Sequence, residues 1–150
     1  MIPKEDRAPP RAVILAAGVG RRLEIDHPKC LLRIGGRTLL DRHLDHLGRL
    51  GVDDVVLVLG HQKDRIEHAL RGRTGIRTLM NPDYRRGSTH VHIHEGRAEA
   101  PYEEAIRDLL LADPNDFGFE DITGLPWIEI DFPQDLRRAE EEVLPALSEP

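Results

Sequence analysis

The chain has 150 residues, 39% of them hydrophobic and 32% charged, with a formal net charge of -6 at pH 7. This composition is typical of one globular domain, and the negative charge argues against a nucleic-acid or anionic-membrane partner. Cys30 is the single cysteine, which excludes a disulfide within the chain and favours a reducing, cytoplasmic location. Residues 1–10 are predicted to be a flexible tail without a signal-peptide core, and residues 11–150 a single domain without a membrane span.

The first half of the chain alternates between apolar runs and amphipathic stretches. Buried strands are predicted at 11–18, 55–59 and 76–80. A short apolar stretch at 30–34 ends in a Gly35-Gly36 turn. Helices are expected at 64–71 and from a cap at Thr38 to about Leu50. Because right-handed crossovers place such strands side by side, we expect an α/β fold: a three-layer, Rossmann-like, mostly parallel sheet flanked by helices.

The second half is less regular. The alternation of His90-Val91-His92-Ile93-His94 predicts a strand, residues 101–112 predict a helix, and residues 125–130 predict a last strand. Asp131 is then expected to cap a closing helix from Phe132 to about Leu147.

The first predicted strand runs directly into Gly18-Val19-Gly20-Arg21-Arg22, a turn that is rich in both glycine and cations. Glycines allow backbone N–H groups to converge on an anion, and arginine or lysine neutralises its charge. In parallel sheets, ligands bind at the carboxyl ends of the strands, which is where this turn lies. The pattern therefore predicts a phosphate-binding loop in a protein that handles a nucleotide.

Several segments together resemble the nucleotidyltransferase superfamily that includes the sugar-nucleotide pyrophosphorylases. LAAGVGRRL, from Leu15 to Leu23, and the following Pro28-Lys29 resemble the family signature, and GGRTLLDRHLDHL and NPDYRRGST are similar to later family segments. The ending GLPWIEIDFPQDLRRAE is similar to that of cytidylyltransferases that activate phosphocholine, inositol phosphate or phosphonates. The resemblance implies transfer of a nucleoside monophosphate, CMP from CTP, to a small phosphate ester with release of pyrophosphate. The implied partners are a nucleoside triphosphate and a small phosphorylated substrate.

The resemblance also implies roles for individual residues. Arg22, together with Arg21, would hold the β- and γ-phosphates, and Lys29 would offset charge at the reacting phosphates, so Arg22 and Lys29 are the predicted catalytic residues. The predicted nucleotide-binding residues are Leu15, Ala16, Ala17, Gly18, Gly20, Arg21, Asn81 and Ser88. For Asn81, a turn role beside Pro82 is an open alternative.

Asp131 is the predicted metal ligand, for Mg²⁺. In a strand at 125–130, alternation would place Trp127, Glu129 and Asp131 on one face, and Mg²⁺ prefers carboxylate and phosphate oxygens. The alternative is a helix-capping role for Asp131, and Asp135 is expected to stabilise the N-terminus of the same helix.

The sequence departs from the family pattern in two places. Arg21 stands where the family has serine or threonine. The chain is also truncated relative to the family, because we find no middle strand that ends in a metal-binding aspartate. Leu109 to Asp113 imitates that strand but is predicted to be a helix end. The shortened middle predicts that a second chain, or residues 90–94, completes the sheet, which suggests an oligomer or an exchanged dimer.

Two alternative functions remain open at this point. The chain could be a catalytically impaired remnant domain that binds nucleotide, or a metal-binding protein that uses His90, His92 and His94. Trp127, Tyr102 and Tyr84 could form a cage for a quaternary ammonium group, although we expect core packing for Trp127.

Overall fold

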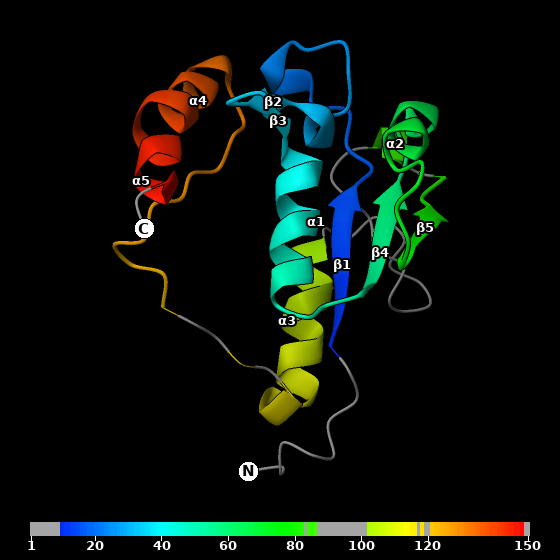
Figure 1. The fold of residues 1–150 in the computed structure, drawn as a ribbon. Helices are drawn as coiled ribbons and strands as arrows, with labels where there is room; N and C mark the ends of the chain where they lie inside the picture. Colours follow the sequence, from blue (N-terminus) through cyan, green and yellow to red (C-terminus); the bar gives the residue numbers. More distant parts are fainter. Residues whose placement is uncertain (1–9, 83, 87–101, 117, 119–120, 149–150) are drawn as a thin grey trace.

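The computed structural model describes residues 10–82, 84–86, 102–116, 118 and 121–148. Its centre is a parallel sheet of three strands, β1 (Arg11–Ala16), β4 (Asp54–Leu59) and β5 (Ile76–Met80), in the order β1-β4-β5 (Figure 1). Arg11 lies opposite Asp54 and Val55 opposite Ile76, so the three strands begin and end at nearly the same level. The predicted α/β fold, with a parallel sheet flanked by helices, is confirmed.

Helices α1 (Leu39–Arg49) and α2 (Lys63–Ala69) connect these strands and pack on one face of the sheet. Thr38 caps α1 as predicted, because its hydroxyl accepts a hydrogen bond of 3.0 Å from the Asp41 backbone N–H. The helical spacing of leucines in α1 and the alternation along β4 bring apolar side chains together between helices and sheet. This main core comprises Ala16, Leu40, Leu44, Val55, Leu57, Leu59 and Ile66.

The opposite face of the sheet is more open. Val13 and Leu79 are each 59% exposed there, and Leu15 is 41% exposed. Within the described part of the chain, β1 pairs only with β4, so its outer edge has no neighbouring strand. Helix α3 (Tyr102–Ala112), which confirms the helix predicted at 101–112, passes behind α1 and β1 in Figure 1.

A second core joins the middle of the chain to its C-terminal segment. Strands β2 (Arg33–Ile34) and β3 (Arg37–Thr38) form a hairpin around Gly35 and Gly36, whose φ angles of 55° and 80° suit a tight two-residue turn. Helix α4 (Pro133–Arg138), the π-helical stretch η6 (Ala139–Val143) and α5 (Leu144–Ser148) lie beside this hairpin in Figure 1. The buried residues of this second core are Leu23, Leu32, Ile34, Ile130 and Ala139.

The strand predicted at 125–130 is wrong, whereas the closing helix is confirmed. Residues 125–130 form no strand, although burial still alternates, with Ile130 buried and Glu129 exposed. The apolar side of this segment packs on the second core instead of on a neighbouring strand. The closing helix runs from Pro133 to Ser148 as α4, η6 and α5, and its middle part, η6, is π-helical. Pro145 has no N–H to donate to the Glu141 carbonyl, which accounts for a π-helical stretch just before it.

Three of the predicted features lie outside the described residues. These are the strand at 90–94, Ser88, and nearly all of the tail at residues 1–10. No helix in the described ranges is both long enough and apolar enough to cross a membrane.

Candidate functional site

The carboxyl ends of the three parallel strands are tied together by backbone hydrogen bonds. The His61 N–H donates to the Ala17 carbonyl at 3.1 Å, which joins the residues after β1 and β4. The Asn81 N–H donates to the Leu59 carbonyl at 2.8 Å, which joins the residue after β5 to β4. Asn81 is buried, with 7% of its surface exposed. The glycine-rich loop therefore starts from a rigid edge, as a site at the ends of parallel strands requires.

The loop leads through two short 3-10 helices that carry the predicted cations. Arg21 and Arg22 lie in η2 (Arg21–Leu23), and Lys29 begins η3 (Lys29–Leu31). Buried Leu23 anchors η2 in the second core, and Pro28 is fully buried beside Lys29. These buried residues fix the backbone, so that the cationic side chains start from defined positions.

Arg22 and Lys29 converge on Asp131. The Lys29 Nζ lies 2.9 Å from Oδ1 of Asp131, and the Arg22 Nη2 lies 2.8 Å from Oδ2. The Asp131 side chain is 21% exposed, that of Lys29 37% and that of Arg22 64%. The Arg22 guanidinium also lies 5.5 Å from the centre of the Phe132 ring. The structure thus brings both predicted catalytic residues and the predicted metal ligand together, although 102 residues separate Lys29 from Asp131.

Asp131 is held at this position by its neighbours. Ile130 is buried in the second core, and Asp135 accepts hydrogen bonds from the backbone N–H groups of Asp131, at 3.0 Å, and Phe132, at 2.8 Å. These bonds lower the pKa of Asp135. The predicted capping role of Asp131 is therefore wrong, because Phe132 is the N-cap residue of α4 and Asp135 supplies the carboxylate. The carboxylate of Asp131 is left to contact the two cations.

The remaining predicted residues lie on or near the same loop. Ala16 and Ala17 are buried, whereas Leu15 points to the open face of the sheet. Gly18 is exposed, and a Cβ added to it would meet no atom within 4 Å. Gly20 begins the turn into η2, because its carbonyl accepts the Leu23 N–H at 3.0 Å.

Gly60, His61 and Tyr84 also gather at this edge, although no sequence motif links the three residues. A Cβ on Gly60 would lie 2.6 Å from the Tyr84 Cβ and 2.7 Å from the Ala17 carbonyl oxygen. The rings of His61 and Tyr84 have their centres 6.2 Å apart. Their position in the sequence could have indicated this. Gly60-His61 follows the second predicted strand as Gly18 follows the first, and the carboxyl ends of parallel strands lie at the same edge of a sheet.

The exposure of Trp127 in the C-terminal segment differs from the prediction. Trp127 is 61% exposed, so its expected core packing is wrong. This segment turns its isoleucines, and not Trp127, toward the second core. The side chain of Tyr102 lies outside the described residues.

The described part of the chain holds no group of three or more histidine, cysteine, aspartate and glutamate side chains that could bind a metal. His90, His92 and His94 lie outside that part. Asp113 is exposed just after α3, as a helix end should be, and its Oδ1 accepts the Asn115 N–H at 3.2 Å.

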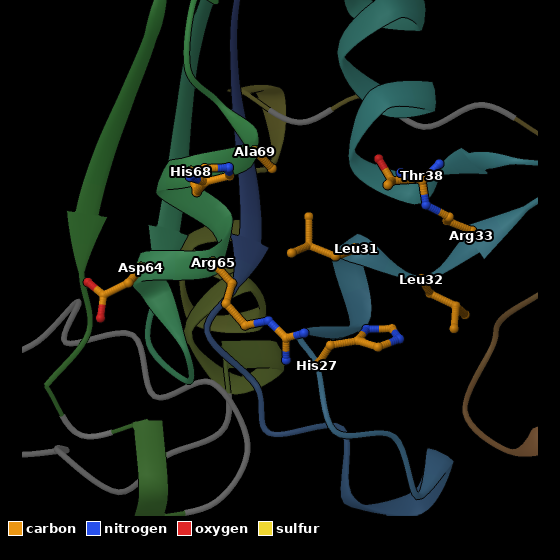
Figure 2. Close-up of a pocket in the computed structure, with 9 residues that line it drawn as sticks. All are labelled: His27, Leu31, Leu32, Arg33, Thr38, Asp64, Arg65, His68 and Ala69. Atoms are coloured by element: carbon orange, nitrogen blue, oxygen red, sulfur yellow. The ribbon is translucent and has the colours of Figure 1, made fainter.

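A separate pocket of about 810 Å³ opens between α2, η3 and the β2–β3 hairpin (Figure 2). None of the predicted site residues lines it. Its wall combines apolar side chains with basic ones, one acidic side chain and one hydroxyl: His27, Leu31, Leu32, Arg33, Thr38, Asp64, Arg65, His68 and Ala69.

Comparison with known proteins gives the family. Residues 12–107 match the family described as "MobA-like NTP transferase domain". The chain belongs to this family. The predicted resemblance to nucleotidyltransferases is thereby confirmed, and the match includes β1 from its second residue, the glycine-rich loop, Lys29, β4 and β5.

Curated relatives and solved structures match parts of the chain. A CMP-5'-(3-aminopropyl)phosphonate synthase from Streptomyces rubellomurinus is 40% identical over 84 residues, which cover 52% of this chain and 13% of that protein. The bifunctional protein GlmU from Bordetella petrii is 42% identical over 64 residues, covering 43% of this chain and 14% of GlmU. The CTP:phosphocholine cytidylyltransferase from Streptococcus pneumoniae (LicC) is 27% identical with a TM-score of 0.48, covering 52% of this chain and 35% of LicC. The chain thus matches only a small part of each curated relative.

Proposed function

We propose that this chain carries out nucleotidyl transfer, moving CMP from CTP to a small phosphate or phosphonate substrate with release of pyrophosphate. The observation that carries the proposal is the convergence of Arg22 and Lys29 next to a glycine-rich loop at the carboxyl end of β1. Membership of the NTP transferase family supports the reaction class. The choice of CMP is supported by the 40% identity to a CMP-phosphonate synthase.

In this reaction an oxygen of the acceptor attacks the α-phosphorus of CTP. A new phosphorus–oxygen bond forms, and the bond between the α-phosphorus and the bridging oxygen of the leaving pyrophosphate breaks. Such transfers are catalysed by positioning and by neutralisation of charge. The backbone of the loop from Gly18 to Gly20 would bind the phosphates, Arg22 would neutralise the leaving pyrophosphate, and Lys29 would face the reacting phosphate.

Asp131 is the residue that would hold Mg²⁺. Its carboxylate oxygens are the hard ligands that Mg²⁺ prefers, and one protein carboxylate together with substrate phosphates is a common Mg²⁺ environment. When bound, Mg²⁺ would supply further neutralisation of the phosphate charge. Both oxygens of Asp131 contact cations in this structure, so the carboxylate must change partners before it can serve a metal.

The test is pyrophosphate release from each of the four nucleoside triphosphates in the presence of Mg²⁺. Acceptors are 3-aminopropylphosphonate, phosphocholine and a sugar 1-phosphate. We expect release with CTP and one of these acceptors, and a loss of about a hundredfold in kcat/KM for Lys29→Met. Lys63→Met is the matched control, because the ion pairs of Lys63 are with Asp64 and Glu67 on α2. Equal activity of the two variants would contradict the role of Lys29.

The remnant-domain hypothesis predicts a different result. Nucleotide binding measured by calorimetry, without pyrophosphate release for any acceptor, would favour it over catalysis. It is motivated by the metal-binding aspartate that we do not find in the middle of the sequence. The His-rich alternative is tested by elemental analysis of untagged protein, and the absence of a transition metal would remove it.

The proposed homodimer has a structural motivation, since β1 has a free outer edge in the described part of the chain. Light scattering of the purified chain tests it. A monomeric mass at all concentrations would exclude the dimer.

A further inference from the structure

The carboxylate of Asp131 takes the place where an anionic ligand of Arg22 and Lys29 would bind. Each of its two oxygens lies within 3 Å of one cation. The inference drawn from this contact rests on the proposed function, in which the same two cations bind the phosphates of CTP. A phosphate group and the Asp131 carboxylate therefore require the same partners.

The surroundings of Asp131 restrict which part of it can move. Its backbone is fixed by buried Ile130 on one side and by the hydrogen bond to Asp135 on the other. Its side chain has only two rotatable bonds and is 21% exposed, so the carboxylate can turn away while the backbone stays in place. Arg22 also has a second contact, with the Phe132 ring, that does not involve the carboxylate.

We propose that Asp131 is a positioning residue and a competing anion: it holds Arg22 and Lys29 in place before nucleotide arrives, and triphosphate binding displaces its carboxylate from both cations. After displacement the carboxylate remains close to the phosphates, and like charges at such separations repel. A divalent cation held by Asp131 would neutralise negative charge there and so would reduce this repulsion. Asp131 thus makes triphosphate binding depend on the metal ion.

The test compares wild type with Asp131→Asn by calorimetric titration, using CTP and inorganic tripolyphosphate as probes. In EDTA, we expect both probes to bind Asp131→Asn about tenfold more tightly, because the competing charge is gone. With Mg²⁺, binding to wild type should tighten by a larger factor than binding to the variant. Tripolyphosphate lacks base and sugar, so its binding reports only on the groups that contact phosphate, which are the two cations and the loop backbone.

Asp26→Asn is the matched control. It removes the same charge from an exposed residue of the same loop region. The side chains of Gln62 and Arg65 donate hydrogen bonds to the backbone carbonyl of Asp26, and this substitution leaves that carbonyl in place. We expect it to bind both probes as wild type does. Asp131→Glu keeps the charge on a longer side chain and should retain weak binding in EDTA. Thermal unfolding checks that each variant is folded. If Asp131→Asn does not fold, Asp131→Ser provides a second neutral variant.

The outcomes separate this inference from the proposed function. If wild type binds neither probe with or without Mg²⁺, the proposed function fails. If wild type binds CTP with Mg²⁺ but the neutral variants bind no more tightly in EDTA, the function stands and the competition is overturned. Weaker binding by the neutral variants in EDTA would overturn it as well, because Asp131 would then only position the cations.

Discussion

Gly18 and Gly60 follow the ends of β1 and β4, yet the structure predicts opposite consequences for replacing each with alanine. A Cβ on Gly18 would meet no atom within 4 Å, and the residue does not have a positive φ. A Cβ on Gly60 would lie 2.6 Å from the Tyr84 Cβ and 2.7 Å from the Ala17 carbonyl oxygen. The space beside Gly18 is open for a ligand, whereas the space beside Gly60 is filled by protein.

The expected magnitudes follow from these contacts. Gly18→Ala should stabilise the chain by about 0.4–1 kcal/mol, because alanine reduces the entropy of the unfolded state without strain in the folded state. It should weaken CTP binding by about tenfold, or 1.4 kcal/mol, because its methyl group occupies the approach of the phosphates. Gly60→Ala should destabilise the chain by about 1–3 kcal/mol, as overpacking does, which lowers Tm by about 2–12 °C in a chain of this size.

Urea unfolding of the two variants and calorimetric titration of CTP provide the measurements. The reasoning is refuted if Gly18→Ala loses as much stability as Gly60→Ala. It is also refuted if Gly18→Ala is as stable as wild type and binds CTP equally well, because the loop backbone would then not contact the nucleotide.

Three further predictions concern the core, the helix cap and the thiol. Leu57→Ala should cost about 2–5 kcal/mol in urea unfolding, because Leu57 has no exposed surface and its loss leaves a cavity; a change under 1 kcal/mol would contradict the assigned core. The lowered pKa of Asp135 means that its ionised form stabilises the fold above about pH 4 and that this contribution is lost as pH falls through the lower folded-state pKa. The difference in stability between wild type and Asp135→Asn should therefore shrink in acid, and a constant difference from pH 7 to 2 would argue against this cap. Burial raises the pKa of Cys30 to about 11, so iodoacetamide at pH 8 should modify the folded chain far more slowly than the urea-unfolded chain. Equal rates would show that the thiol is accessible and ionisable.

Local sequence patterns were sufficient for the elements of the main core. Strands were indicated by the apolar runs at β1, β4 and β5, and a helix by the leucines at helical spacing in α1. In each element, the spacing of the apolar residues determines which side is buried. Short connections and right-handed crossovers then leave few arrangements other than a parallel sheet. The position of the glycine-rich loop at the carboxyl end of β1 follows from the same reasoning.

The C-terminal segment shows where local patterns fail. The alternating pattern at residues 125–130 does correspond to alternating burial, since Ile130 is buried and Glu129 is exposed. A strand, however, also needs a neighbouring strand to form hydrogen bonds with its backbone. Alternation alone does not contain that information. Pro145 gave a local reason for irregularity in the closing helix, because it lacks the N–H that a regular helix needs.

The amino-acid sequence by itself determined the sheet elements, the loop with its glycines and cations, and the family to which these segments belong. Only the tertiary structure decided what Asp131 does, because its contacts with Arg22 and Lys29 depend on how a distant segment packs on the second core. Capping by Asp131 and contact with cations are equally compatible with its local sequence. In the structure, the burial of Ile130 fixes the position of Asp131, and the carboxylate of Asp135 accepts the helix N-terminal hydrogen bonds. Asp131 therefore contacts the cations and does not cap the helix.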